Sequence, residues 1–160
     1  MIPVLNRTYD TQICSIARTL EVVGERWTLL VLRDVLRGTR RFEEFVQSLG
    51  VARNVLSDRL DRLVAHGLVE RKPYQDHPPR FEYHPTPKGS ELLVVVLGLM
   101  HWGDRHLAGR AGPPRLAEHR DCGGAVVEQL TCTSCGQALT PGEITTRPGP
   151  GLREHDPAAV

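Results

Sequence analysis

The sequence has no long hydrophobic run: its longest apolar stretch, residues 92 to 97, is far too short to span a bilayer. It also has no positively charged and then apolar opening segment, because the chain turns polar at Asn6 and Arg7. A signal peptide is therefore not expected, and we expect a cytoplasmic protein.

The sequence also lacks recognisable arrangements of catalytic residues. We find no Ser-His-Asp spacing, no glycine-rich phosphate loop and no paired carboxylates, and the seven histidines are scattered. We therefore expect no enzyme activity. The formal net charge is only +1, which neither requires nor excludes a nucleic acid partner, since binding depends on where basic residues gather. Four cysteines in a cytosolic chain favour metal ligands or reactive thiols over structural disulfides.

The 160 residues are enough for one compact domain and a small appendage. An apolar, helically periodic body is expected over residues 12–108, followed by a Gly- and Pro-containing linker at 109–118. Residues 119–148 carry three of the cysteines and form a separate small module. Residues 149–160 have little apolar content and are expected to be disordered.

Two short helices joined by a glycine-containing turn are predicted in the middle of the body. Phe42, Phe45, Val46 and Leu49 recur at helical spacing, and Gly50 ends that helix. In the next helix, which closes at 66–67, the leucines at 56, 60 and 63 share one face and polar residues occupy the other. This arrangement is typical of a helix-turn-helix.

A β-hairpin is predicted directly after these helices. Residues 68–74 and 80–84 flank a turn-rich segment with Pro78 and Pro79, and the second run alternates apolar and polar residues. A proline-containing tip cannot lie in a central strand and must project. The sequence therefore predicts a mainly α fold with a small β-hairpin wing, a winged helix-turn-helix, plus a C-terminal Cys/His knuckle module.

A long helix is predicted from Thr86, as N-cap, and Pro87, in the first helical position, to about Leu107. It is apolar on nearly all sides, so more than its own small domain must cover it. A homodimer interface explains this pattern, and it would include Leu92, Val96, Leu99, Met100 and Trp102.

Taken in order, these pieces resemble the HxlR family of bacterial winged-helix regulators over roughly residues 14 to 106. The matching segments are Cys14-Ser15-Ile16, Gly24-Glu25-Arg26-Trp27, Arg41-Phe42, Leu56-Ser57-Asp58-Arg59-Leu60, His66-Gly67-Leu68-Val69-Glu70-Arg71, Pro79-Arg80-Phe81-Glu82-Tyr83, Thr86-Pro87-Lys88-Gly89 and Trp102-Gly103. The resemblance implies a two-fold dimer formed through the terminal helices, which binds a pseudo-palindromic operator, and no enzyme activity.

Such a dimer would place two recognition helices in successive major grooves of double-stranded DNA. Arg53, Asn54 and Ser57 lie in the first turns of the recognition helix and are the candidates for base contacts. Phosphate or minor-groove contacts are expected from a second set: Arg41, Arg59, Arg62, Arg71, Lys72 and Arg80. For any single arginine, a solvated charge or an intrahelical pair is the competing interpretation.

Cys14 is a candidate redox sensor. It precedes the first helix, where amide dipoles favour a thiolate, and Arg18 lies one turn further on. In some members of the HxlR family, a cysteine at this position senses oxidants or electrophiles. The alternative is a small, partly buried hydrophobic residue at a helix start.

The tail holds two similar motifs, each a ligand, two residues, a cysteine and a glycine. His119, Cys122, Cys132 and Cys135 supply the four N/S ligands of a structural zinc site, and residues 125–130 between them are predicted to be a strand. This resembles a small zinc ribbon. A redox-active Cys-x-x-Cys pair and a module without ligand are the alternatives.

We therefore predict a sequence-specific DNA-binding transcriptional regulator, a repressor in its mode of action. The alternative is a winged-helix module for protein interaction, with a zinc-stabilised docking platform. Trp27, Met100 and Trp102 are open to two interpretations, a pocket for a small hydrophobic effector or plain dimer core.

Overall fold

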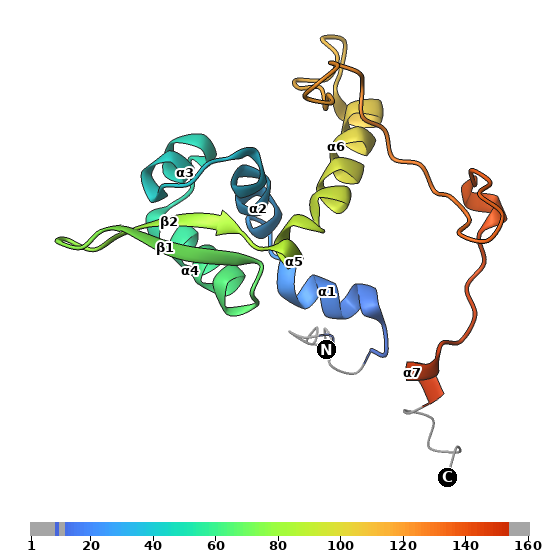
Figure 1. Cartoon of the computed structure of the whole chain (residues 1–160), viewed down its shortest axis with the longest axis horizontal. Helices are drawn as coiled ribbons and strands as arrows, with labels where there is room; N and C mark the ends of the chain where they lie inside the picture. The colour runs from blue at the N-terminus through green and yellow to red at the C-terminus, as the bar shows by residue number, and fades with distance from the viewer. Residues whose placement is uncertain (1–8, 10–11, 154–160) are drawn as a thin grey trace, which may run out of the picture. The chain divides into compact units, whose positions relative to one another are not determined.

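The computed structural model describes Tyr9 and residues 12–153 of the chain (Figure 1). The chain divides into two compact units, residues up to 96 and residues from 97 onward. The elements are α1 (Ser15–Val23), α2 (Thr28–Arg37), α3 (Phe42–Leu49), α4 (Arg53–Ala65), β1 (Val69–Gln75), β2 (Arg80–Pro85), α5 (Pro87–Ser90), α6 (Leu93–Leu107), η1 (Pro141–Glu143) and α7 (Pro150–Arg153).

The core of the first unit lies among α2, α3, α4 and the start of the hairpin. Phe45, Leu32, Leu56 and Leu60 are fully buried there. The Phe45 and Tyr83 rings meet edge to face, with 6.2 Å between their centroids, and so join α3 to β2. The apolar faces predicted for α3 and α4 are therefore confirmed as the faces that build the core.

A buried carboxylate fixes the register of α2 against α3. Asp34 in α2 is 3% exposed, yet both of its carboxylate oxygens have donors. The guanidinium of Arg33 donates to one oxygen at 2.8 Å, and the Ser48 hydroxyl donates to the other at 2.6 Å. A buried charge is tolerated only with such partners, so this contact specifies how the two helices meet.

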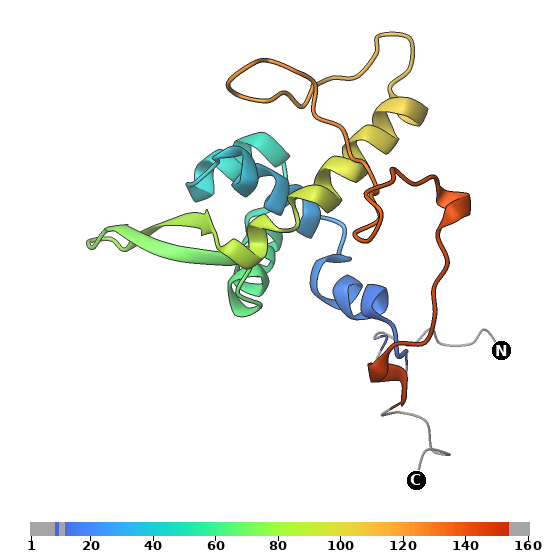
Figure 2. The same ribbon diagram turned by 45° about the vertical axis from the view of Figure 1, so that its right-hand side comes forward.

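The predicted hairpin is confirmed. Strands β1 and β2 pair antiparallel from Val69 opposite Pro85 to Gln75 opposite Arg80, with an irregularity between Pro73 and Gln75. The tip projects away from α2, α3 and α4 in both ribbon views (Figures 1 and 2). The Tyr83 amide donates to the Arg40 carbonyl at 2.9 Å, which ties β2 to the chain just before α3. The wing therefore has a fixed position relative to the helix-turn-helix.

The single helix predicted from Pro87 to Leu107 is wrong in one respect, because it is broken into α5 and α6. The Thr86 hydroxyl caps α5 as expected, accepting a hydrogen bond from the Gly89 amide at 3.0 Å. At the break, the Leu92 amide bonds to the Gly89 carbonyl, only three residues back. A side chain at position 89 would meet the Leu68 carbonyl oxygen at 1.9 Å, so the backbone of α5 is pressed against the start of β1. This tight contact requires glycine and accompanies the break.

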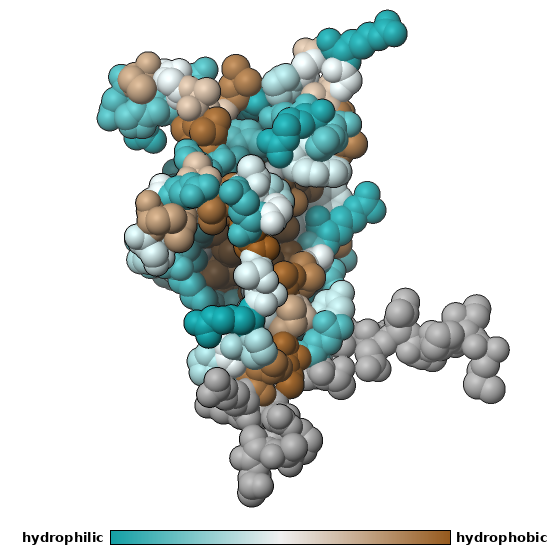
Figure 3. Space-filling view, turned by 90° about the vertical axis from the view of Figure 1, so that its right-hand side faces the viewer, coloured by the Kyte–Doolittle hydropathy of each residue, from teal (hydrophilic) through white to brown (hydrophobic). Residues whose placement is uncertain are grey.

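Helices α1 and α6 carry apolar side chains that are not covered by other described residues. Ile16 in α1 is 72% exposed, and no residue of α6 is buried. Of the predicted dimer residues, Leu99 and Trp102 are exposed, while Leu92, Val96 and Met100 are half-buried. Figure 3 shows apolar residues, in brown, reaching the surface on one face of the protein. Within the described part of the chain, no helix combines the length and the apolar character needed to cross a membrane.

The second unit has little regular structure after α6. Glu128 accepts a hydrogen bond from the His101 ring at 2.7 Å, which attaches this segment to α6. The strand predicted over 125–130 is wrong, because only isolated bridges join Glu118 to Ala125 and Thr131 to Ala138. A strand needs a continuous neighbour to bond its backbone, whereas this segment is bonded only near its ends, from the Val126 amide to Ala117 and from Leu139 to the Leu130 carbonyl. Part of the tail predicted to be disordered forms α7, and residues 154–160 lie outside the described residues. The domain boundaries expected from the sequence stay a prediction.

Candidate nucleic-acid interface

The exposed face at the start of α4 carries the three predicted base-reading residues. Leu56, Leu60 and Leu63 turn one side of this helix into the core. Arg53, Asn54 and Ser57 lie on the other side and are all exposed. Neither Asn54 nor Ser57 has a side-chain hydrogen bond to another described residue, so their polar groups are free to meet a ligand.

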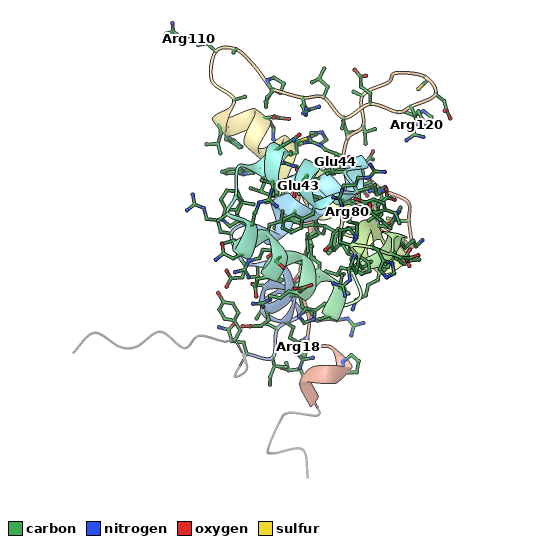
Figure 4. All side chains as sticks on the ribbon, turned by 90° about the vertical axis from the view of Figure 1, so that its left-hand side faces the viewer. Arg18, Glu43, Glu44, Arg80, Arg110 and Arg120 are labelled. Carbon is green, nitrogen blue, oxygen red and sulfur yellow. The ribbon has the colours of Figure 1, made fainter. Side chains whose placement is uncertain are left out.

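Arg53 is not free, because Glu43 of α3 holds it. Two guanidinium nitrogens of Arg53 donate to the two Glu43 oxygens at 2.7 and 2.5 Å, and both side chains are 62% exposed. The hydrogen bonds from Arg53 hold the pKa of Glu43 below its usual range, and the charge of Arg80 lowers this pKa further. Glu43 therefore lies between the recognition helix and the wing, and Figure 4 shows it beside Arg80.

The wing presents Lys72 on β1 and Arg80 on β2, both exposed. The Lys72 ammonium pairs with Glu70 on its own strand at 2.7 Å. Arg80 makes no hydrogen bond or ion pair within the part of the chain that the structure describes. An exposed guanidinium without a bonded partner is suited to bind a phosphate, because no ion pair or hydrogen bond within the protein has to be broken first.

Arg41 and Arg71 pack against the wing itself. Arg41 lies 4.7 Å from the centroid of the Tyr74 ring and pairs with Glu82 at 3.2 Å. Arg71 lies 4.6 Å from the Phe81 ring and 3.8 Å from Asp61 of α4. Both arginines fix the hairpin against the helices through cation–π contacts and ion pairs. Both side chains nevertheless stay exposed, Arg41 at 54% and Arg71 at 44%.

The structure does not gather Arg59 and Arg62 with the other predicted contacts. Arg62 donates to the Glu21 carbonyl at the end of α1, at 3.1 Å. The side chain of Arg59 is only 17% exposed and pairs with Glu25 at 3.5 Å and with Asp58 at 3.4 Å. Arg62 is turned towards α1 and Arg59 towards Glu25 just after it, because the α-helical period carries both round from the face of Ser57. We therefore leave them out of the interface.

Acidic residues share the exposed face of α4. Asp58 and Asp61 are both exposed there. Carboxylates repel phosphates, so the later turns of this helix must stay further from the DNA backbone than the first turn. This favours an approach in which the N-terminal end of α4 enters the groove.

The remaining predicted sites lie elsewhere. Cys14 is the N-cap residue of α1, half-buried and not in a disulfide. In the tail, His119 Nδ1 lies 3.2 Å from Cys122 Sγ. The amides of Cys135 and Ser134 hydrogen-bond to the Cys132 sulfur and lower the pKa of that thiol. The two pairs are not together: among the described residues, no three His, Cys, Asp or Glu side chains gather as a metal site would require.

The sequence did not reveal the parts played by Glu43 and Glu21. Acidic residues are common in the first turn of a helix, so Glu43 carried no special signal. Glu21 acts through its backbone carbonyl, which no sequence pattern marks. Pairing between elements distant in sequence becomes visible only in the folded chain.

Together, the helix pair α3–α4, the projecting hairpin and the exposed polar start of α4 define a winged helix-turn-helix protein of the transcription-regulator class. The HxlR-like helix-turn-helix family model matches residues 22–110. The chain belongs to this family.

Known relatives agree with this assignment. The chain is 45% identical over 139 residues to "Uncharacterized HTH-type transcriptional regulator Rv3095" of Mycobacterium tuberculosis, covering 87% of this chain and 88% of that protein. The crystal structure of PA1607 is similar with a TM-score of 0.77 and 31% identity, over 86% of this chain and 96% of that one. The redox regulator HypR in its reduced form is similar with a TM-score of 0.55 and 31% identity, over 57% and 92%. Because the match to Rv3095 takes in 139 of 160 residues, it must include positions 22 to 139.

Proposed function

We propose that this protein is a sequence-specific DNA-binding transcriptional regulator that reads bases with the start of α4. The observation that carries the proposal is the exposure of Arg53, Asn54 and Ser57 at the start of α4, with Glu43 lying between Arg53 and Arg80 of the wing. Lys72 is a second exposed cation on the wing. Arginine matches the two acceptors of guanine, and asparagine matches the donor and acceptor of adenine. Wing cations beside them would meet the backbone and fix the register.

We further propose that two copies bind a pseudo-palindromic operator as a two-fold dimer and repress transcription by occupying it. The uncovered apolar residues of α1 and α6 support a second copy as their cover. Exposed apolar surface of this kind is rare on monomers and common at interfaces. With two-fold symmetry, the two α4 helices would enter successive major grooves about one helical turn apart.

The test is a binding titration with labelled DNA from the intergenic region next to the protein's own gene. A scrambled duplex of equal length serves as the control, and both are measured at several salt concentrations. We expect tighter binding to the natural sequence, a footprint of two half-sites about one turn apart, and a dimer by sedimentation. Failure to bind either duplex at low salt would overturn the proposal and favour a winged-helix module for protein docking.

We propose Cys14 as the point at which oxidants or electrophiles act on this regulator. The side chain stands at the N-terminus of α1, and the other end of the same helix contacts the recognition helix through Glu21 and Arg62. A change in the position of α1 would therefore alter its contact with α4 and could shift the recognition helix. The similarity to the redox regulator HypR supports a thiol-based signal.

A further inference from the structure

Two turns in the C-terminal unit have the same backbone, thirteen residues apart in sequence. The Gly123 amide bonds to the His119 carbonyl at 2.8 Å, and the Gly136 amide bonds to the Cys132 carbonyl at 2.8 Å. The His119 amide bonds to the Gly124 carbonyl at 2.8 Å, and the Cys132 amide bonds to the Gln137 carbonyl at 2.9 Å. A third equivalent pair links Val126 to Ala117 and Leu139 to Leu130. The agreement extends over the whole of each turn, so this is a structural repeat rather than a short motif.

Each turn places its two candidate ligands on the same side. Gly123 and Gly136 have φ angles of 69° and 75°, the left-handed conformation that closes each turn. In the first turn, the ring nitrogen of His119 lies 3.2 Å from the Cys122 sulfur. In the second, the amides of Ser134 and Cys135 point at the Cys132 sulfur. In both turns two residues separate the candidate ligands, the spacing found in structural zinc sites.

The second nitrogen of His119 faces a carboxylate, at a distance longer than a hydrogen bond. His119 Nε2 lies 3.7 Å from the Asp121 carboxylate, while Nδ1 faces the sulfur. Metal-binding histidines usually direct their second ring nitrogen at a carboxylate or a carbonyl, which fixes the tautomer and the ring orientation. The first turn therefore offers Nδ1 as the ligand atom.

Among its described residues, this unit has no buried hydrophobic side chain that could hold the turns together. Val127 and Leu130, which connect the two turns, are 74% and 55% exposed. Segments this short bury too little apolar surface to fold alone and usually depend on disulfides or a metal. All four cysteines of the chain are thiols in the structure.

We propose that the two turns are the halves of one structural zinc site, with His119, Cys122, Cys132 and Cys135 as its four ligands. One nitrogen and three sulfurs in tetrahedral geometry suit Zn²⁺, and four protein ligands leave no open position for catalysis. The two halves lie apart in the structure, and the nine residues between Cys122 and Cys132 act as a tether that brings them onto one ion. Closure would also cover Val127 and Leu130. The two turns, up to residue 139, lie within the part of the chain that Rv3095 matches.

The test is elemental analysis of the full-length protein, purified with a thiol reductant and dialysed against metal-free buffer. We expect about one zinc per chain. After replacement of the metal by Co²⁺, the visible bands of tetrahedral cobalt and the thiolate charge-transfer band should appear. Less than about a tenth of a zinc per chain after incubation with excess Zn²⁺ would overturn the proposal and leave a dithiol pair as the explanation.

Variants separate the site from general thiol binding. Cys132→Ser and His119→Ala should each lose zinc, while Cys14→Ser should keep it. His119→Cys should also keep it, because sulfur can replace nitrogen at a structural zinc site. DNA binding by the same preparations shows that the winged domain is folded in each variant. If Cys132→Ser folds and keeps a full equivalent of zinc, the assignment is wrong.

Discussion

Arg53, at the start of the recognition helix, is held on the carboxylate of Glu43 in the preceding helix by hydrogen bonds of 2.7 and 2.5 Å. The residue best suited to read a guanine is therefore occupied by a neighbour before DNA arrives. Binding a base must exchange one bidentate partner for another, and Glu43 also brings a negative charge to a surface that would face phosphates.

Removing this carboxylate charge should strengthen DNA binding. In Glu43→Gln, Arg53 loses its ionic partner and the surface loses a repulsive charge. We expect affinity for the operator to rise by up to about fivefold, the scale of an exposed ion pair. Fluorescence anisotropy with labelled operator measures it, and Glu91→Gln, an exposed carboxylate outside α3, α4 and the wing, is the control. Weaker binding by Glu43→Gln alone would show that Glu43 instead orients Arg53 for the base.

Arg53 should contribute to specificity more than to general affinity. Arg53→Ala removes a bidentate base contact, so binding to the operator should fall by about 10- to 100-fold. Binding to random DNA should fall only a few-fold, because one cation is lost. Competition titrations against both duplexes measure the two losses. Arg18→Ala is a matched control, since Arg18 is an exposed arginine on α1, well away from Glu43 and Arg80 in Figure 4. Equal losses on both duplexes would reduce Arg53 to a phosphate contact.

Arg80 and Arg62 should show opposite behaviour. Arg80 is exposed and lacks a bonded partner among the described residues, so Arg80→Ala should lower the slope of log affinity against log salt by about one and leave stability unchanged. Arg62 binds the Glu21 carbonyl, so Arg62→Ala should lower the free energy of unfolding by about 1 kcal/mol and leave the slope unchanged. Salt titrations of both variants measure the slope, and urea unfolding measures the free energy of unfolding. A reduced salt slope in Arg62→Ala would restore it as a phosphate contact.

This contrast shows where sequence reasoning succeeds. Helices α3 and α4, their apolar faces and the wing were predicted, because each depends on local periodicity and on turn residues that act over a few positions. The buried positions of Phe45, Leu56 and Leu60 follow from the same period. These elements define the fold class.

What could not be predicted depends on contacts between distant segments. Arg59 and Arg62 have the same charge as Arg53, and only the packing of α1 against α4 shows that they turn inward. The break between α5 and α6 accompanies a close approach of Gly89 to the backbone of Leu68, about twenty residues earlier in the sequence. Residues 125–130 have strand-like composition, but among the described residues only isolated bridges and bonds near the two ends pair their backbone. The propensity of a segment indicates which secondary structure it prefers, and its tertiary contacts decide which one it adopts.

Cys14 should link two chains under oxidation if it senses oxidants. Treatment with diamide followed by a non-reducing gel should give a band at dimer mass, and the band should disappear in Cys14→Ser. Cys132→Ser/Cys135→Ser should keep the band, which separates Cys14 from the tail thiols. Oxidation should also change the affinity for operator DNA, since α1 contacts α4 through Glu21. Monomer throughout, with unchanged DNA binding, would end the proposal.

Gly89 should be intolerant of even one added methyl group. In an ordinary helix, Gly→Ala raises stability by roughly 0.5–1 kcal/mol. Here the new Cβ would stand 1.9 Å from the Leu68 carbonyl oxygen, which is backbone and cannot rotate away. We expect Gly89→Ala to lower the free energy of unfolding by roughly 1–3 kcal/mol, as overpacked sites do. Urea unfolding measures it, and Ser90→Ala, the exposed next residue of α5, should change stability little.

The same substitution should also affect the wing. Leu68 joins the end of α4 to the start of β1, and its carbonyl also accepts a hydrogen bond from the Thr86 amide at 3.1 Å. A shift of this backbone would move the hairpin relative to the recognition helix. Well below its unfolding midpoint, Gly89→Ala should therefore bind operator more weakly than Ser90→Ala does. If both variants match the wild type in stability and in DNA binding, then the contact between Gly89 and Leu68 does not position the wing.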